Sequence, residues 1–152
     1  GEFSVYLAQI SDSVKVGVTR TGNLRRRWVE QGADYGVEIL HGLDAKVALE
    51  NESDISSKGI TERIRKEKKL PAAKESDLLR EKMEEHGFEG DIVAVQKLTV
   101  YPEVSGSFRR KGLFEGELQS VKGQIVSNGR ISLAMGSGKV LKKPEQKGLG
   151  EF

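Results

Sequence analysis

The first 32 residues alternate apolar and polar positions in a pattern that predicts two strands and a helix. The segments "FSVYLAQI" (3–10) and "VKVGVTR" (14–20) have the composition of strands, and the polar "SDS" between them is typical of a β-hairpin. After "TGN", Asn23 is a predicted N-cap for a helix that begins at Leu24 and ends at Gly32.

The next 25 residues extend the same pattern by one strand and one helix. "VEILHGL" (37–43) predicts a third strand, and "DAKVALENESDIS" (44–56) predicts a helix capped by Asp44. The "SDS" connection is too short for a parallel crossover, so the first two strands must be antiparallel. We therefore expect an α+β fold in which residues 1–58 form a three-stranded antiparallel sheet flanked by helices.

The rest of the chain predicts two further regions. Residues 59–89 are highly charged and mostly helical in pattern, interrupted at Pro71 and ended at Gly87, so they read as a helical connector. Residues 90–152 read as a small β-rich unit, because "DIVAVQKLTVYP" and "FEGELQSVKGQIVSNGRISLAM" are strand-like. Within the latter, Asn128-Gly129 is the strongest short-range signal for a hairpin turn in the chain.

Composition narrows the class of protein without indicating a partner. The chain has 152 residues, 36% of them hydrophobic, which suffices for one ordinary domain or two very small ones. It contains no cysteine, which favours a reducing cytoplasmic location, and no apolar run approaches the ~20 residues of a membrane span. The net charge of +2 indicates no particular partner.

Basic residues nevertheless cluster at four places along the chain. The clusters are "RRR" (25–27), "RIRKEKK" (63–69), "RRK" (109–111) and "GKVLKK" (138–143). Together they could line a surface that binds phosphate groups. The alternative is that they are ordinary solvated surface residues, as in most soluble proteins.

The chain also supplies the groups that phosphodiester hydrolysis requires. That reaction needs a base for the attacking water, a cation for the charge on phosphorus and a carboxylate that holds a divalent metal. Tyr6 lies in the first predicted strand and Arg27 in the first helix. In the second helix, spacing places Glu52 on the inward face with Ala48, Leu49 and Ile55, and Glu50 on the outward face.

These segments, in this order, resemble the GIY-YIG nuclease superfamily. "VYL", "KVGVT" and "NLRRRW", followed by a glutamate in the next helix, correspond to its "GIY", "YIGxT" and "NLxxR" motifs and downstream glutamate over residues 3–56. More narrowly, "VYLA", "KVGVTR", "RRRWVEQGA", and "GELQSVKGQI" followed by "NGR" resemble an uncharacterised prokaryotic domain-of-unknown-function family regarded as GIY-YIG-like. This second resemblance spans most of the chain.

The superfamily resemblance implies a role for individual residues. Tyr6 matches the tyrosine of "GIY", the proposed general base or its relay, and Gly17 matches the glycine of "YIG". Thr19 matches the hydroxyl residue of that motif, and Arg27 matches the arginine that contacts phosphate. Glu52 matches the glutamate that binds Mg²⁺ or Mn²⁺. The implied partner is DNA or RNA.

The chain departs from the superfamily pattern at two positions near these residues. Lys15 replaces the second tyrosine, and it could donate a hydrogen bond or lower the pKa of a neighbouring phenol. Gln31, on the helix face of Leu24 and Trp28, stands where many relatives carry a histidine. Further residues predicted to contact nucleic acid are Thr19, Arg25, Arg26, Arg63, Arg65 and Lys66.

Three functional hypotheses follow from this sequence. The first is a metal-dependent phosphodiesterase that acts on nucleic acid, with Tyr6, Lys15, Arg27 and Glu52 as catalytic residues. The second is an inactive nucleic-acid-binding or regulatory domain on the same scaffold, and the third is a protein-interaction module. The residues also have plain structural alternatives: Tyr6 as a packing residue, and Glu52 as the partner of Arg27 in an ion pair.

Overall fold

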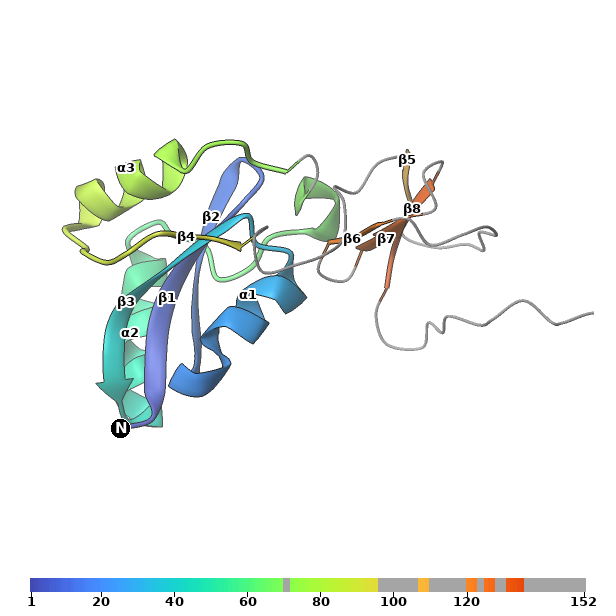
Figure 1. Ribbon diagram of the computed structural model, residues 1–152. Coiled ribbons are helices and arrows are strands. Elements are labelled where there is room, and N and C mark those ends of the chain that lie inside the picture. Colours follow the sequence, from blue (N-terminus) through green and yellow to red (C-terminus); the bar gives the residue numbers. More distant parts are fainter. Residues whose placement is uncertain (70–71, 96–106, 110–119, 123–124, 128–130, 136–152) are drawn as a thin grey trace, which may run out of the picture.

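The main sheet of the protein is antiparallel and has four strands. The computed structural model describes residues 1–69, 72–95, 107–109, 120–122, 125–127 and 131–135. The strands are β1 (Phe3–Ile10), β2 (Ser13–Arg20), β3 (Tyr35–Leu43) and β4 (Val93–Ala94), in the order β2-β1-β3-β4. Adjacent strands run antiparallel, and β1 and β2 form the predicted hairpin (Figure 1).

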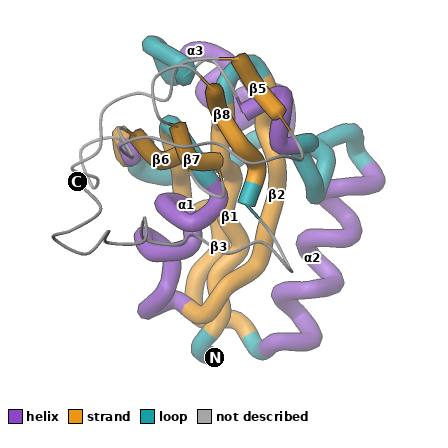
Figure 2. Tube along the Cα trace, turned by 90° about the vertical axis from the view of Figure 1, so that its right-hand side faces the viewer, coloured by secondary structure: helices purple, strands orange, loops and turns teal. Residues whose placement is uncertain are grey.

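Helices cover both faces of this sheet. They are α1 (Leu24–Gln31), α2 (Ala45–Ser57) and α3 (Asp77–His86), with 3-10 turns η1 (Thr21–Asn23) and η2 (Lys66–Lys69). Figure 2 shows α1 and α2 on opposite sides of the sheet. Among the described residues, no helix combines the length and the apolar character needed to cross a membrane.

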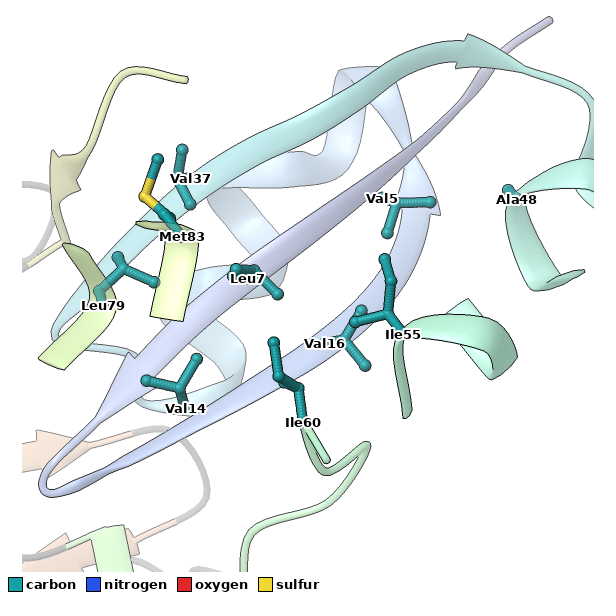
Figure 3. Close-up of a cluster of buried hydrophobic side chains, with 10 residues drawn as sticks. All are labelled: Val5, Leu7, Val14, Val16, Val37, Ala48, Ile55, Ile60, Leu79 and Met83. Carbon is teal, nitrogen blue, oxygen red and sulfur yellow. The ribbon is translucent and has the colours of Figure 1, made fainter. Parts of the chain in front are cut away.

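The alternation of side chains along the strands produces two apolar layers. Val5 and Leu7 of β1 belong to a buried cluster under α2 and α3 (Figure 3). Tyr6 and Ala8, on the other face of β1, pack with Trp28 of α1 in a second cluster. The two faces of one strand therefore hold helices against opposite sides of the sheet, and α1 is fixed over the face that carries Tyr6.

A second, smaller sheet comes from the C-terminal region. Its strands are β5 (Ser107–Arg109), β6 (Ser120–Lys122), β7 (Ile125–Ser127) and β8 (Ile131–Ala134), in the order β5-β8-β7-β6. The antiparallel pairing of β7 with β8 is the one expected around Asn128-Gly129, although that turn itself lies outside the described residues. β5 and β8 are parallel.

The structure corrects the predicted number of strands in the main sheet. The sheet has four strands instead of three, because Val93–Ala94 pairs with β3. Among the described residues from 59 to 89, only α3 is an α-helix. Thr61 instead forms a bridge with Lys15 at the outer edge of β2, and Val16 N donates to Thr61 O over 2.9 Å. The edge strand β2 has unpaired backbone groups that can bond to another segment. Side-chain periodicity, on which the prediction of a helix rests, gives no information about such pairing.

The predicted N-cap residues lie at the N-cap positions, without a capping hydrogen bond from their side chains. Asn23 and Asp44 occupy the N-cap positions of α1 and α2, but neither side chain accepts a hydrogen bond from its helix. Gly32 ends α1 as predicted, with a left-handed φ of 73°, and Gly87 ends α3 in the same way. Both positions suit glycine because it adopts this conformation without a steric penalty.

Candidate functional site

Polar side chains gather where the outer strand β2 meets α1. Val14 and Val16 of β2 pack into the cluster under α2 and α3, so Lys15 and Gly17 face the side that carries Tyr6. Tyr6 and Gly17 are register partners, and a Cβ at residue 17 would collide with the Tyr6 hydroxyl. Glycine at this position therefore lets the phenol lie directly against the strand.

The Gln31 side chain lies at the centre of this group. The Tyr6 hydroxyl is 2.9 Å from the Gln31 amide. With the amide oxygen turned toward the two cations, Gln31 accepts from Lys15 Nζ at 3.0 Å and from Arg27 Nε at 3.2 Å, and its nitrogen stays 2.9 Å from the phenol. This orientation is the sound one, because lysine and arginine are donors only. One buried amide thus aligns a phenol, an amine and a guanidinium.

Two carboxylates complete the group. Glu52 is half-buried on α2, whereas Glu50 is exposed, as helical spacing predicts. Burial, followed by the negative charge of Glu62, raises the pKa of Glu52, and the charge of Lys15 acts in the opposite direction. The Thr61 bridge places Glu62 next to the β2 edge. We call Tyr6, Lys15, Arg27, Gln31, Glu52, Glu62 and Arg63 the β2-edge cluster.

The inward face of α2 is narrower than its sequence predicts. Ala48 and Ile55 are buried as expected, but Leu49 is 56% exposed. Glu52 therefore lies at the border of the packed face, where its carboxylate retains access to solvent. A half-buried position is one at which a carboxylate can be close to other cluster groups and still reach a ligand.

Burial changes the acid-base character of two further groups in the cluster. It raises the pKa of the Tyr6 phenol, against the weaker lowering effects of the Gln31 hydrogen bond and Arg27. Burial, followed by the positive charge of Arg27, lowers the pKa of Lys15, and the negative charges of Glu52 and Glu62 act in the opposite direction. Arg63 adds to the lowering. The Tyr6 phenol is therefore protonated at neutral pH, and the Lys15 amine loses its proton more readily than a surface lysine does.

The remaining predicted residues lie at the rim or elsewhere. Arg27 is half-exposed, and its Nη1 is 3.9 Å from Glu30 Oε2, so its ion-pair partner within the described chain is Glu30 instead of Glu52. Arg26 binds the same Glu30 carboxylate through Nε at 2.7 Å. Arg25, Arg63 and Arg65 are exposed, Thr19 is half-buried on β2, and the side chain of Lys66 lies outside the described part.

Sequence reasoning missed the roles of Gln31 and Glu62. The helical spacing places Gln31 on the face of Trp28, and its polar character on a buried face is a signal that it serves as a hydrogen-bonding partner. Glu62 carries no comparable signal. It joins the cluster through a backbone bridge between residues 15 and 61, which are far apart in the sequence.

The carboxylates of the β2-edge cluster suit a metal ion that keeps part of its water shell. No group of three histidine, aspartate or glutamate side chains in the described residues could enclose a metal ion. Glu52 is half-buried, Glu62 is exposed, and the charge of Glu62 raises the pKa of Glu52. Mg²⁺ is commonly bound by one or two carboxylates together with water and substrate phosphate oxygens, so the Glu52 carboxylate fits such an ion.

Comparison with known proteins identifies a family and nothing more. A family model described as "Protein of unknown function (DUF2797)" matches residues 1–127. No curated protein matches the chain, and neither does any solved structure. The matched range includes the main sheet and every residue of the β2-edge cluster.

Proposed function

The chain belongs to the DUF2797 family, and we propose that its β2-edge cluster binds a phosphodiester of nucleic acid and hydrolyses it with the help of a divalent metal. The observation that carries this proposal is the shared position of Lys15 and Arg27. Both donate to the same Gln31 oxygen, at 3.0 and 3.2 Å, so two cations are held side by side at a solvent-accessible rim. Such a pair suits a phosphate oxygen anion.

The order of the cluster residues along the chain supports the same proposal. Tyr6, Gly17, Arg27 and Glu52 lie on two hairpin strands, the following helix and the next helix. This is the order of the GIY-YIG nuclease motifs, which the sequence resembles. A phosphodiesterase on this scaffold would need all four positions near one another, and the electrostatic coupling of Tyr6 to both Arg27 and Glu52 is consistent with that need.

The metal would be held by Glu52 with Glu62 beside it. Mg²⁺ or Mn²⁺ in this position would supply positive charge to the phosphate and a more acidic water. Arg27 binds the phosphate and stabilises the charge that develops on it. The Tyr6 phenol keeps its proton, and its hydrogen bond with Gln31 holds the amide that aligns Arg27 and Lys15. Lys15 adds a second positive charge beside the phosphate.

The burial of Tyr6 favours a second candidate, a nucleic-acid-binding domain without hydrolytic activity. Tyr6 is only 1% exposed, and its hydroxyl is engaged by Gln31. A phenol in this state organises the cluster but has little access to an attacking water. In this alternative, Lys15, Arg27 and Arg63 bind phosphate and no bond is broken.

Cleavage of labelled oligonucleotides distinguishes the two candidates. Single-stranded, duplex and branched DNA and RNA probes would be incubated with the protein in Mg²⁺, Mn²⁺ or EDTA. The proposal predicts metal-dependent cleavage that Glu52→Gln abolishes and Glu50→Gln, the exposed matched control, leaves nearly unchanged. Binding without cleavage would favour the inactive domain, and neither binding nor cleavage would favour a protein-interaction module.

A further inference from the structure

The Lys15 side chain combines the features of a nucleophilic amine. It is half-buried on β2, and its Nζ is 3.0 Å from the Gln31 amide oxygen. Arg27 donates to the same oxygen from 3.2 Å, so a second cation adjoins the amine. Lysines that are desolvated and placed beside another cation are the ones that form Schiff bases with carbonyl compounds.

The surroundings of the amine restrict the carbonyl compound that it can meet. Arg27 and Arg63 act on Lys15 electrostatically in one direction, and Glu52 and Glu62 act in the other. Both arginine side chains reach solvent, so a ligand that pairs with them at Lys15 would carry phosphate beside its carbonyl group. The aldehyde of a base-free deoxyribose in DNA has this chemistry, because its C1′ carbonyl lies between two phosphodiesters. This match rests on the proposed nucleic-acid binding of the cluster.

We propose that Lys15 forms an imine with the C1′ aldehyde of an abasic site in DNA and that the protein cleaves the strand there by β-elimination. This activity needs no metal. It would be a second reaction of the same site, distinct from phosphodiester hydrolysis.

The reaction balances without an oxidant or a reductant. The Lys15 nitrogen bonds to C1′, and the aldehyde oxygen leaves as water. A proton then passes from C2′ to solvent, its electron pair forms the C2′–C3′ double bond, and the C3′–O bond breaks with release of a 5′-phosphate end. Water finally hydrolyses the imine, which returns the amine and leaves an unsaturated aldehyde on the other strand end.

Neighbouring residues have separate roles in this reaction. The Gln31 oxygen orients the amine, and the Tyr6 phenol fixes the Gln31 amide from the buried side. Arg27 is placed to bind the phosphate that departs from C3′, where it stabilises the leaving charge. Glu52 is not required, which separates this reaction from the metal-dependent one.

Borohydride trapping in EDTA tests the proposal. A fluorescent oligonucleotide with one abasic site, single-stranded or in a duplex, would be mixed with the full chain and reduced to convert the imine into a stable amine. A tetrahydrofuran analogue, which has no aldehyde, measures binding alone. Matched variants are Lys15→Arg and Lys58→Arg, the latter at an exposed lysine after α2.

We expect a covalent adduct with the wild type and with Lys58→Arg, and its loss in Lys15→Arg down to the level of an unrelated protein. Proteolysis and mass spectrometry of the wild-type adduct should place the oligonucleotide on residue 15, which tests the assignment even if Lys15→Arg fails to fold. Binding of the analogue without trapping, or an adduct on another amine, would overturn the lyase proposal alone. Absence of binding to any oligonucleotide would overturn the proposed function as well.

Discussion

Folding moves the side chains of Lys15 and Glu52 from water into surroundings in which their charged forms are less stable. Burial lowers the pKa of Lys15 and raises that of Glu52, so each is harder to keep ionised in the folded protein than in the unfolded chain. A charged group of this kind lowers the free energy of unfolding. Such a cost is expected at a site that uses these groups chemically.

Replacement of Lys15 by methionine should therefore stabilise the protein at neutral pH. The folded pKa of Lys15 lies below its unfolded value. The charged side chain therefore reduces the free energy of unfolding fully at pH values below the folded pKa, and this reduction disappears as pH rises toward the unfolded value near 10.5. Thermal unfolding from pH 7 to 10.5 should show the advantage of Lys15→Met shrinking with pH. A difference in melting temperature between Lys15→Met and wild type that grows with pH would contradict a lowered pKa of Lys15.

The Glu52→Gln variant should show the opposite pH dependence. The folded pKa of Glu52 lies above 4.5, so its cost is absent below that pH and accumulates as pH rises through the folded pKa. Thermal unfolding should show Glu52→Gln and wild type converging in acid and the variant melting higher at pH 7. The exposed Glu50→Gln serves as the control, and an equal gain there would show that the effect is one of net charge only.

The Gln31 amide should contribute more to the free energy of unfolding than the amide of a surface glutamine does. Gln31→Leu would leave the buried Tyr6 hydroxyl without this partner, at a cost of about 1–3 kcal/mol. Tyr6→Phe removes the hydroxyl, so the double variant should lose less stability than the sum of the two single variants. Chemical denaturation of the four proteins measures this coupling, and strict additivity would mean that the hydrogen bond contributes nothing.

At the level of secondary structure, the sequence predicts what local patterns determine. The hairpin of β1 and β2, the helix from Leu24 to Gly32 and the pairing around Asn128-Gly129 all depend on neighbours within a few residues. The fourth strand and the Thr61 bridge depend on partners tens of residues away, which periodicity does not identify. For the same reason the sequence predicts Tyr6, Lys15, Arg27 and Glu52 as candidate site residues. It does not predict that Gln31 hydrogen-bonds to three of them or that Glu62 lies beside the β2 edge.

The Thr61 bridge should be visible in hydrogen exchange. Val16 and Val18 both point their N–H groups away from β1, because outward N–H groups alternate along an edge strand. Val16 N donates to Thr61 O at 2.9 Å, so its amide should exchange more slowly than that of Val18. Equal, fast exchange at both amides would show that residues 60–63 do not hold Glu62 at the cluster in solution.

For the whole molecule, a buried ionic network joins the C-terminal sheet to the main one. Lys122 of β6 lies 3.2 Å from Asp34 Oδ2, and both side chains are more than nine-tenths buried. The same oxygen accepts from Ser11 N and Ala73 N, at 2.7 and 2.9 Å. Lys122 also donates to the carbonyl of Lys69. The network therefore connects the first hairpin, the segment after η2 and β6.

Loss of Lys122 should destabilise the entire fold. Lys122→Met leaves the buried Asp34 carboxylate without its cation, at a cost of roughly 3 kcal/mol or more. The exposed pair of Lys58 and Asp54 provides the comparison, since Lys58→Met should cost less than about 1 kcal/mol. Denaturant unfolding measures both. Equal effects would show that the two sheets are not joined through Asp34.

The central claim is that the β2-edge cluster binds phosphate, and salt-dependent fluorescence anisotropy tests it most directly. Binding of a short labelled oligonucleotide would be measured over a range of salt concentrations for wild type, Arg27→Met and Arg80→Met. Arg80 is exposed on α3, and α3 packs on the opposite face of the sheet from α1. The claim predicts that Arg27→Met weakens binding and reduces the slope of log K against log salt by about one, while Arg80→Met changes neither. Equal losses in the two variants, or a wild type that binds no oligonucleotide at low salt, would contradict it.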